Sequence, residues 1–211
     1  MSERRPRRRY HHGDLRRALL ESATAWVVER GADTFSLREI SQGLGVSPMA
    51  AYRHFPHRDS LLAAVAQQGF ESLEAALSAA VSGHETPPEQ LLAAGHAYVT
   101  FGRRQPRLLH LMFGIPLPPW TQNDAPADEG AAALARAAGA AYRRLEDVIQ
   151  AGMRAGCFRS EAPRALVVGA WAVVHGLAML GDAGRMTGGM STEDVEQVLR
   201  YWISGITAVA P

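Results

Sequence analysis

The stretch from residue 35 to residue 61 constrains the fold of this chain more than any other part of the sequence. Ser36 is followed three residues later by Glu39, the spacing of a capping box, so a helix is predicted to begin there. Apolar residues then recur at helical spacing. Gly43 and Gly45 are predicted to end this helix, because glycine adopts the positive φ of a helix C-cap without steric cost.

A second helix is predicted to begin at Ser47-Pro48. Serine is a favourable N-cap, and proline suits the first helical position, where no N–H is needed. Two helices of about two turns joined by a short glycine turn form a helix-turn-helix, which places its second helix in the major groove of DNA. The stretch therefore predicts an all-α DNA-binding unit.

The segment before this motif completes a three-helix head. The sequence predicts a helix over His12–Arg30, with apolar side chains on one face and Gly31 as its end. Residues 1–12 are predicted to be a disordered basic arm that is attracted to phosphate. The alternative is a solvated tail without a partner. Residues 1–60 carry 11 Arg against 7 acidic residues, whereas the remainder carries 11 Arg against 14 acidic residues. This asymmetry fits a nucleic-acid-binding head on a mildly acidic body.

The rest of the chain is predicted to form a helical body. A long helix should run from Arg58 to about Val81 and link the head to the body mechanically. Further helices are predicted over 87–104, 106–112, 128–155 and 161–180, with a last one capped at Ser191. A proline-rich loop is expected over 114–126. The predicted domains are 1–12 (arm), 13–57 (DNA-binding head) and 58–211 (ligand-binding and dimerisation body).

The last two helices are the most apolar part of the body. Residues 161–180 are apolar nearly all round, and the final helix carries a broad apolar stripe. A chain of 211 residues has few places to bury both surfaces internally. We therefore predict a homodimer in which this helix pair forms a four-helix bundle with its copy. The alternative is that one monomer buries both helices.

Several classes of protein are disfavoured by the sequence. The chain has one cysteine, Cys157, so it cannot form an internal disulfide, and a reducing, cytoplasmic location is expected. It has no run of 18 apolar residues and no secretory signal, so a membrane protein is not expected. The histidines lack zinc-ligand spacing, no glycine-rich phosphate loop is present, and Cys157 lies in no nucleophile motif. We expect neither an enzyme nor a bound metal or cofactor.

Three sequence segments resemble one family. They are GDLRRALLESA at 13–23, FSLREI at 35–40 and GVSPMAAYRHFPHRDSLL at 45–62. Together they resemble the N-terminal domain of TetR/AcrR-type transcriptional regulators over residues 13–62. The segment WAVVHG at 171–176 is similar to the WHG-type C-terminal ligand domain of one branch of that family. The resemblance implies an all-α fold with a helix-turn-helix head and a C-terminal domain that binds a ligand and dimerises.

The resemblance also implies which residues contact DNA. Base edges are expected to be read from the first turn of the second motif helix, where Ser47, Met49, Ala50 and Arg53 are predicted to face outward. Methyl groups of thymine suit Met49 and Ala50, and guanine suits Arg53. The expected phosphate contacts, which fix register without choosing sequence, are Ser36, Arg38, Tyr52, His54 and Arg58. For each polar residue the alternative is a solvated helix face.

In the body, large or polar-tipped side chains are candidates for a ligand pocket between helices. The predicted pocket residues are His96, Phe101, Met112, Phe113, Trp120, Tyr142, Trp171 and His175. The last two are four residues apart and therefore share one helical face. Ordinary core packing is the alternative for each of them.

From these features we predict a transcriptional repressor that binds a pseudo-palindromic operator as a homodimer and is released by a small-molecule effector. The alternative is a ligand-independent DNA-binding regulator of the same fold that acts with a protein partner. An effector can release DNA only to the extent that it binds the released state more tightly.

Overall fold

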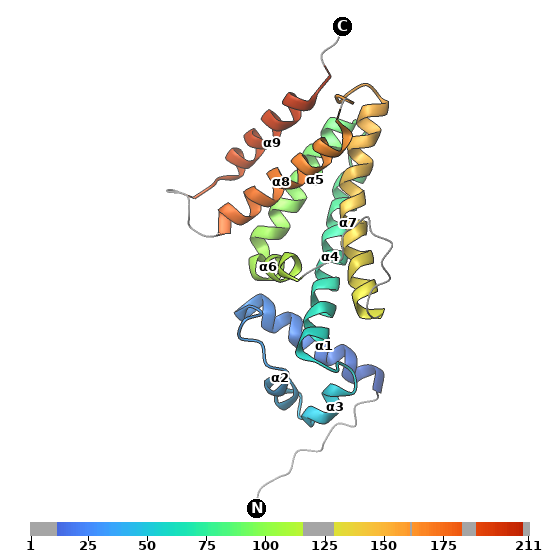
Figure 1. Cartoon of the computed structure of the whole chain (residues 1–211). Coiled ribbons are helices and arrows are strands. Elements are labelled where there is room, and N and C mark those ends of the chain that lie inside the picture. The colour runs from blue at the N-terminus through green and yellow to red at the C-terminus, as the bar shows by residue number, and fades with distance from the viewer. Residues whose placement is uncertain (1–11, 116–128, 161, 183–188, 209–211) are drawn as a thin grey trace, which may run out of the picture.

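The computed structural model describes residues 12–115, 129–160, 162–182 and 189–208. Its regular structure within these ranges is helical, which confirms the predicted all-α fold (Figure 1). The one β contact found there is an isolated antiparallel bridge between Phe158 and Thr207. The helices are α1 (His12–Arg30), α2 (Leu37–Gly43), α3 (Pro48–Tyr52), α4 (Arg58–Ser82), α5 (Pro87–Arg104), α6 (Pro106–Gly114), α7 (Glu129–Arg154), α8 (Pro163–Asp182) and α9 (Thr192–Ile206).

The helix-turn-helix forms at the predicted place. The Ser36 hydroxyl accepts a hydrogen bond from the backbone N–H of Glu39 at 3.3 Å, and the Ser47 hydroxyl accepts one from Ala50 at 3.2 Å. In the turn between the helices, Gly45 adopts a φ of 69°. Gly43, expected to share that role, is instead the last residue of α2, and the chain leaves the helix through right-handed backbone at Leu44. One positive-φ residue is therefore enough to make this turn.

The helix boundaries differ slightly from the predicted ones. Predictions for α1, α5 and the start of α4 are confirmed. α6 continues two residues beyond its predicted end, to Gly114. α8 begins at Pro163 and not at the predicted residue 161, because proline fits the first helical position, where its missing N–H is not needed. Two parts of the predicted architecture, the basic arm up to residue 11 and the loop from residue 116 to residue 128, lie outside the described residues.

The head, α1–α3, lies at one end of the molecule, and α4 runs from it into the body (Figure 1). There α4 packs most extensively against α7 and α5. The buried side chains of α4 include Leu61 and Val65 near the head and Leu73 and Leu77 in the body. The head and the body share one continuous apolar core, and α4 contributes to it in both parts.

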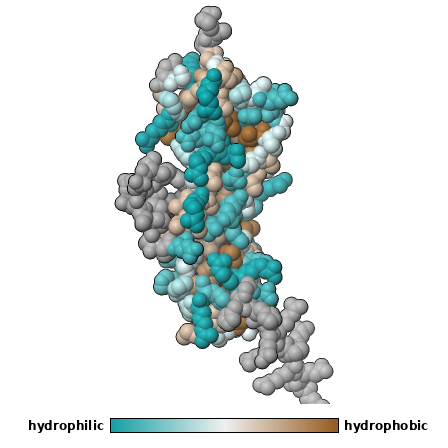
Figure 2. All heavy atoms as spheres, turned by 90° about the vertical axis from the view of Figure 1, so that its right-hand side faces the viewer, coloured by the Kyte–Doolittle hydropathy of each residue, from teal (hydrophilic) through white to brown (hydrophobic). Residues whose placement is uncertain are grey.

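Two outer faces of the body differ in polarity. Seen from the α7 side, the surface is mostly hydrophilic (Figure 2). On α7 this reflects a regular spacing of exposed polar residues, namely Arg136, Arg143, Asp147, Gln150 and Arg154. The opposite is true of α8 and α9, where the exposed large apolar residues are Val168, Leu180, Val198 and Tyr201. The 163–181 stretch of α8 is long and apolar enough to cross a membrane, a test that the core helices of soluble proteins also pass.

A close approach of α4 and α6 depends on Gly69. A Cβ at this position would lie 2.6 Å from the sulfur of Met112 on α6. Met112 is fully buried there. The missing side chain at Gly69 therefore allows α6 to lie against α4, where α6 can contact both the head and the body.

Candidate DNA interface and effector site

The recognition helix α3 exposes much of its surface. Met49 is 66% exposed and Tyr52 is 45% exposed, and Arg53 at the end of the helix also faces solvent. By contrast, Ala51 has no exposed surface, and Phe35 and Phe55 are buried as expected of core residues. The outward side chains expected at Met49 and Arg53 are confirmed as exposed, and α3 anchors itself to the head through Ala51.

Ala50 does not face outward as expected. It is half-buried and packs against the apolar core of the head. The reason is that α3 has only five residues and is anchored through Ala51, so the neighbouring Ala50 also lies against the head. We therefore propose that Ala50 contributes to the DNA interface only through its small side chain, which allows α3 to approach the DNA closely.

The remaining predicted DNA contacts fall into two groups. Ser36 and Ser47 are N-caps, so their hydroxyls are already occupied by backbone N–H groups of their own helices. Arg38 is exposed on α2, and His54 is half-buried just after α3. Helix N-termini with free N–H groups attract phosphate. The two serines are thus better placed to fix these termini than to bind DNA with their side chains.

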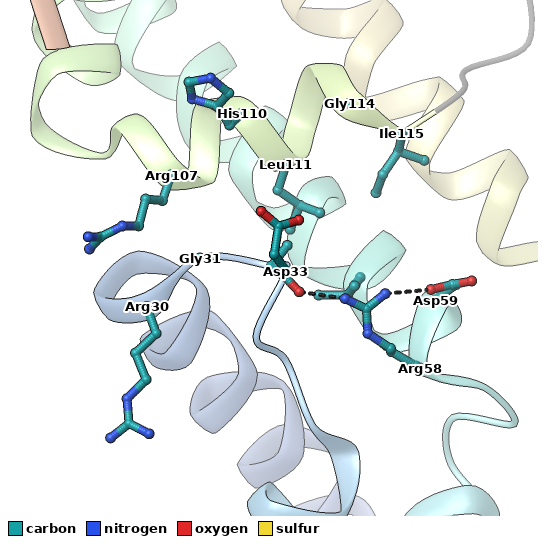
Figure 3. Close-up of a pocket in the computed structure, with 12 residues that line it drawn as sticks. Arg30, Gly31, Asp33, Arg58, Asp59, Arg107, His110, Leu111, Gly114 and Ile115 are labelled. Atoms are coloured by element: carbon teal, nitrogen blue, oxygen red, sulfur yellow. Dashed lines mark hydrogen bonds and ion pairs between the residues drawn. The ribbon is translucent and has the colours of Figure 1, made fainter. Parts of the chain in front are cut away.

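Arg58 is held by the head in a way that the sequence did not predict. From the first turn of α4, its guanidinium donates hydrogen bonds to the backbone carbonyls of Ala32 and, at 3.3 Å, Phe35, and it pairs with Asp59 at 3.1 Å (Figure 3). It also lies over the Phe35 ring. These contacts occupy most of its donors. We propose that Arg58 fixes α4 to the α1–α2 loop, in place of the phosphate contact expected from the sequence.

A second arginine ties the head to α6. Arg107 donates from α6 to the carbonyls of Val28 and Glu29 in the last turn of α1. Arginine suits this position because it satisfies C-terminal carbonyls and complements the negative end of the helix dipole. Between the two arginines lies an open cavity of about 600 Å³, walled by α1, α4 and α6 (Figure 3). None of the seven predicted ligand residues that the structure describes lines it.

A cluster of aromatic rings, which we call the ring cluster, occupies the body where five helices meet. Trp171 on α8 is stacked on Tyr142 of α7, with 5.8 Å between centroids, and meets Tyr98 of α5 edge-on at 5.3 Å. Phe113 of α6 lies 4.6 Å from the His175 ring and 6.3 Å from Trp171. The ring cluster consists of Phe70, Tyr98, Phe113, Tyr142, Trp171 and His175.

The polar tips of the ring cluster are held in neutral forms. The Tyr98 hydroxyl and His175 Nδ1 are hydrogen-bonded at 2.9 Å. Burial raises the pKa of the Tyr98 phenol, so it stays protonated. Burial, and then the nearby charge of His110, lower the pKa of His175. At neutral pH the pair therefore carries no charge.

The structure brings together four of the eight predicted ligand residues, namely Phe113, Tyr142, Trp171 and His175. Phe101 and Met112 are buried in the core, and neither has a ring contact with the cluster among the described residues. His96 points to α9 and lies 3.1 Å from a carboxylate oxygen of Glu196. Trp120 lies outside the described residues. Sequence reasoning missed Phe70, because it falls on the apolar stripe of α4 like any core residue.

Comparison with known proteins decides the family. Residues 19–65 match the family described as bacterial regulatory proteins, tetR family. Residues 91–206 match the tetracyclin repressor-like C-terminal domain, which is more than half of the chain and includes Trp171 and His175. The chain belongs to the TetR family. It is thus a DNA-binding, ligand-binding transcriptional regulator, which confirms the resemblance drawn from its helix-turn-helix.

Individual relatives agree with this TetR-family assignment. The chain is 32% identical to the HTH-type transcriptional regulator BetI of Brucella anthropi over 78 residues, which is 37% of this chain and 40% of BetI. A protein of unknown function from Rhodococcus sp. RHA1 has a similar structure, with 30% identity, a TM-score of 0.79, and coverage of 94% of this chain and 98% of that one. The structure of AibR in complex with isovaleryl coenzyme A and operator DNA shares the fold at 18% identity and a TM-score of 0.62, covering 90% and 97% of the two chains.

Proposed function

We propose that this TetR-family regulator is a homodimeric repressor that leaves a pseudo-palindromic operator when a small molecule binds the ring cluster. The observation that carries the proposal is the position of α6. One end of this helix holds the last turn of α1 through Arg107, and the other end places Phe113 in the ring cluster. A change at the ring cluster therefore has a short physical route to the head.

The DNA-binding part of the proposal is supported by the exposed α3. Its reading side chains are Met49 and Arg53, with Tyr52, His54 and Arg38 on the neighbouring phosphates. AibR, which has the same fold, is described in a complex with both operator DNA and an acyl coenzyme A. The two functions are thus compatible with one fold.

The dimer is supported by the apolar faces of α8 and α9. Val168 is 53% exposed and Tyr201 is 74% exposed in the single chain. Exposed large apolar side chains on two neighbouring helices are typical of subunit interfaces. A two-fold axis beside α8 and α9 would present two copies of α3 to the DNA. Their centres should lie about 34–36 Å apart, or a multiple of that, to read successive major grooves.

The proposed release is a change in this spacing. Displacement of Phe113 moves α6, and α6 carries the last turn of α1 with it through Arg107. Because α4 is held to the same part of the head by Arg58, the head should tilt as one body. The effector shifts the equilibrium by its difference in affinity for the two arrangements, typically about 1–3 kcal/mol.

The test is a fluorescence-anisotropy titration of labelled genomic fragments from the neighbourhood of the chain's own gene, repeated over a salt series. A specific operator complex should persist at a concentration of competitor DNA that removes the non-specific complexes. Adding compounds to the preformed complex then tests release. If compounds that bind the protein all leave the operator affinity unchanged, the induction mechanism is excluded.

One observation favours a ligand-independent regulator as the second candidate. The rings of Phe113, Trp171 and His175 already contact one another, as core residues do. On this alternative the ring cluster is structural, and a protein partner controls DNA binding. The same titration separates the two candidates, because only the first predicts that any small molecule weakens the operator complex.

A further inference from the structure

The ring cluster contains one polar group without a partner. The indole Nε1–H of Trp171 is buried, and no acceptor among the described residues lies within hydrogen-bond distance. Buried donors are rarely left unpaired in folded proteins, because they lose their hydrogen bonds to water without replacement. This donor therefore marks a position where an acceptor atom of a bound molecule would be stabilising.

The surroundings of this donor favour a flat molecule. Tyr142 is nearly parallel to the Trp171 ring, with an interplanar angle of 11°, and Tyr98 is nearly perpendicular to it, at 88°. Aromatic rings associate in these offset-stacked and edge-to-face arrangements. A planar aromatic ligand could replace one of the existing ring contacts with an equivalent one.

The same surroundings disfavour a charged molecule. Tyr98 and His175 are bonded to each other. Glu74 of α4 and Arg144 of α7 are paired with each other at 3.2 Å. An ionised ligand would lose its hydration and find mainly aromatic rings and a neutral hydrogen-bonded pair around it. Aromatic faces can bind cations, but the positive edge of the Trp171 N–H would oppose a cation at this position.

We propose that the ring cluster binds an uncharged, planar aromatic molecule whose acceptor oxygen takes the hydrogen bond of Trp171 Nε1. This inference rests on the proposed function, since it names the chemical class of the effector. It also names Phe113 as the residue that must move. Phe113 is the most exposed large ring of the cluster, at 37%, and it precedes Gly114 at the end of α6.

Four matched probes test the ligand class by equilibrium dialysis against the full chain. Naphthalene supplies the ring alone, 2-acetylnaphthalene adds a neutral acceptor, 2-naphthoate adds a negative charge, and 2-naphthylmethylammonium adds a positive charge. The neutral acceptor should bind about tenfold more tightly than naphthalene, which corresponds to one hydrogen bond. Each charged probe should bind at least about 100-fold more weakly than the neutral acceptor.

Two variants assign the effect to the named atoms. Trp171→Phe keeps a ring but removes the N–H, so the preference for 2-acetylnaphthalene over naphthalene should disappear. Trp202→Phe, on α9, is the matched control and should preserve the preference. Phe113→Ala makes room in the cluster and should tighten binding of both neutral probes severalfold. Thermal melting of each variant shows whether it is folded. If Trp171→Phe does not fold, the binding measured for Phe113→Ala still tests the site.

Equal binding of a charged probe, or a preference that survives Trp171→Phe, would overturn the inference. So would a failure of all four probes to bind. Operator release is measured separately by adding 2-acetylnaphthalene to the DNA complex. Binding without release would exclude the proposed function and leave the inference standing. If other compounds release the operator while none of the four probes binds the protein, the inference is overturned and the proposed function stands.

Discussion

At the scale of single residues, Arg53 is the side chain that we propose to choose a DNA sequence. It is exposed at the end of α3, and a guanidinium can pair with two acceptors of guanine. We expect Arg53→Ala to weaken operator binding by about 1–3 kcal/mol and to remove the preference at one base pair in each half-site. Arg38→Ala, on the exposed face of α2, is the control and should weaken binding to all sequences alike. Anisotropy titrations against single-base operator variants measure both. If Arg53→Ala lowers the affinity for all operator variants equally, Arg53 contacts phosphate and not a base.

Also at the residue scale, Glu74 should make stability depend on pH. A hydrogen bond from Ser78, at 2.5 Å, and the Arg144 guanidinium, at 3.2 Å, lower the pKa of its carboxyl. A pKa lowered by folding means that the unfolded chain binds a proton first as pH falls. The stabilisation is therefore present above the unfolded pKa, near 4.3, and is lost as pH falls through the folded one. Glu74→Gln should cost about 1 kcal/mol of unfolding free energy at pH 7 and much less at pH 3. Urea denaturation at the two pH values checks this, with Glu71→Gln as the exposed control on α4.

At the scale of helices, α6 is the element whose role could not be read from the sequence. Its start at Pro106 was predictable, because proline and helical periodicity are local signals. The contacts of Arg107 with α1 and of Phe113 with α8 join residues far apart in the chain, and no local pattern reports them. The same limit explains Arg58. The family resemblance implied a phosphate contact for it, whereas in the structure its guanidinium donates to carbonyls of the α1–α2 loop and pairs with Asp59.

The link from α6 to α1 leads to a prediction for that pair of helices. Arg107→Ala leaves the carbonyls of Val28 and Glu29 without their donor, so it should lower the unfolding free energy by about 1 kcal/mol. Hydrogen exchange should rise in the last turn of α1 and in the α1–α2 loop, and stay unchanged in α9. Arg104→Ala, also exposed and three residues away, should change neither quantity. Unchanged exchange in α1 after the loss of Arg107 would mean that apolar packing alone holds the head to α6.

At the scale of the whole molecule, the sequence was sufficient for the fold and for four of the six residues of the ring cluster. Capping residues and periodicity located the helices, and the motif from residue 35 to residue 61 identified the head. The ring cluster was only partly predictable, because Trp171 and His175 share a local motif whereas Phe70 and Phe113 reach them by packing of separate helices. Which side chains converge depends on three-dimensional helix packing, and periodicity shows only which face of a helix is apolar.

In the proposed function, the assembly of two chains is the step that makes an operator-binding protein, and this assembly can be tested apart from DNA. Val168 on α8 is exposed, as are the apolar side chains of Val198 and Tyr201 on α9. Val168→Arg would place a charge without a partner in the proposed interface, so the apparent dissociation constant of the dimer should rise at least about 100-fold. Gln150→Arg adds the same charge on the hydrophilic face of α7 and should leave the dimer intact.

Light scattering after size-exclusion chromatography gives the mass of each variant. A Val168→Arg protein that stays dimeric would place the interface on another face, whereas a folded monomer that also loses operator affinity would show that the two recognition helices work as a pair.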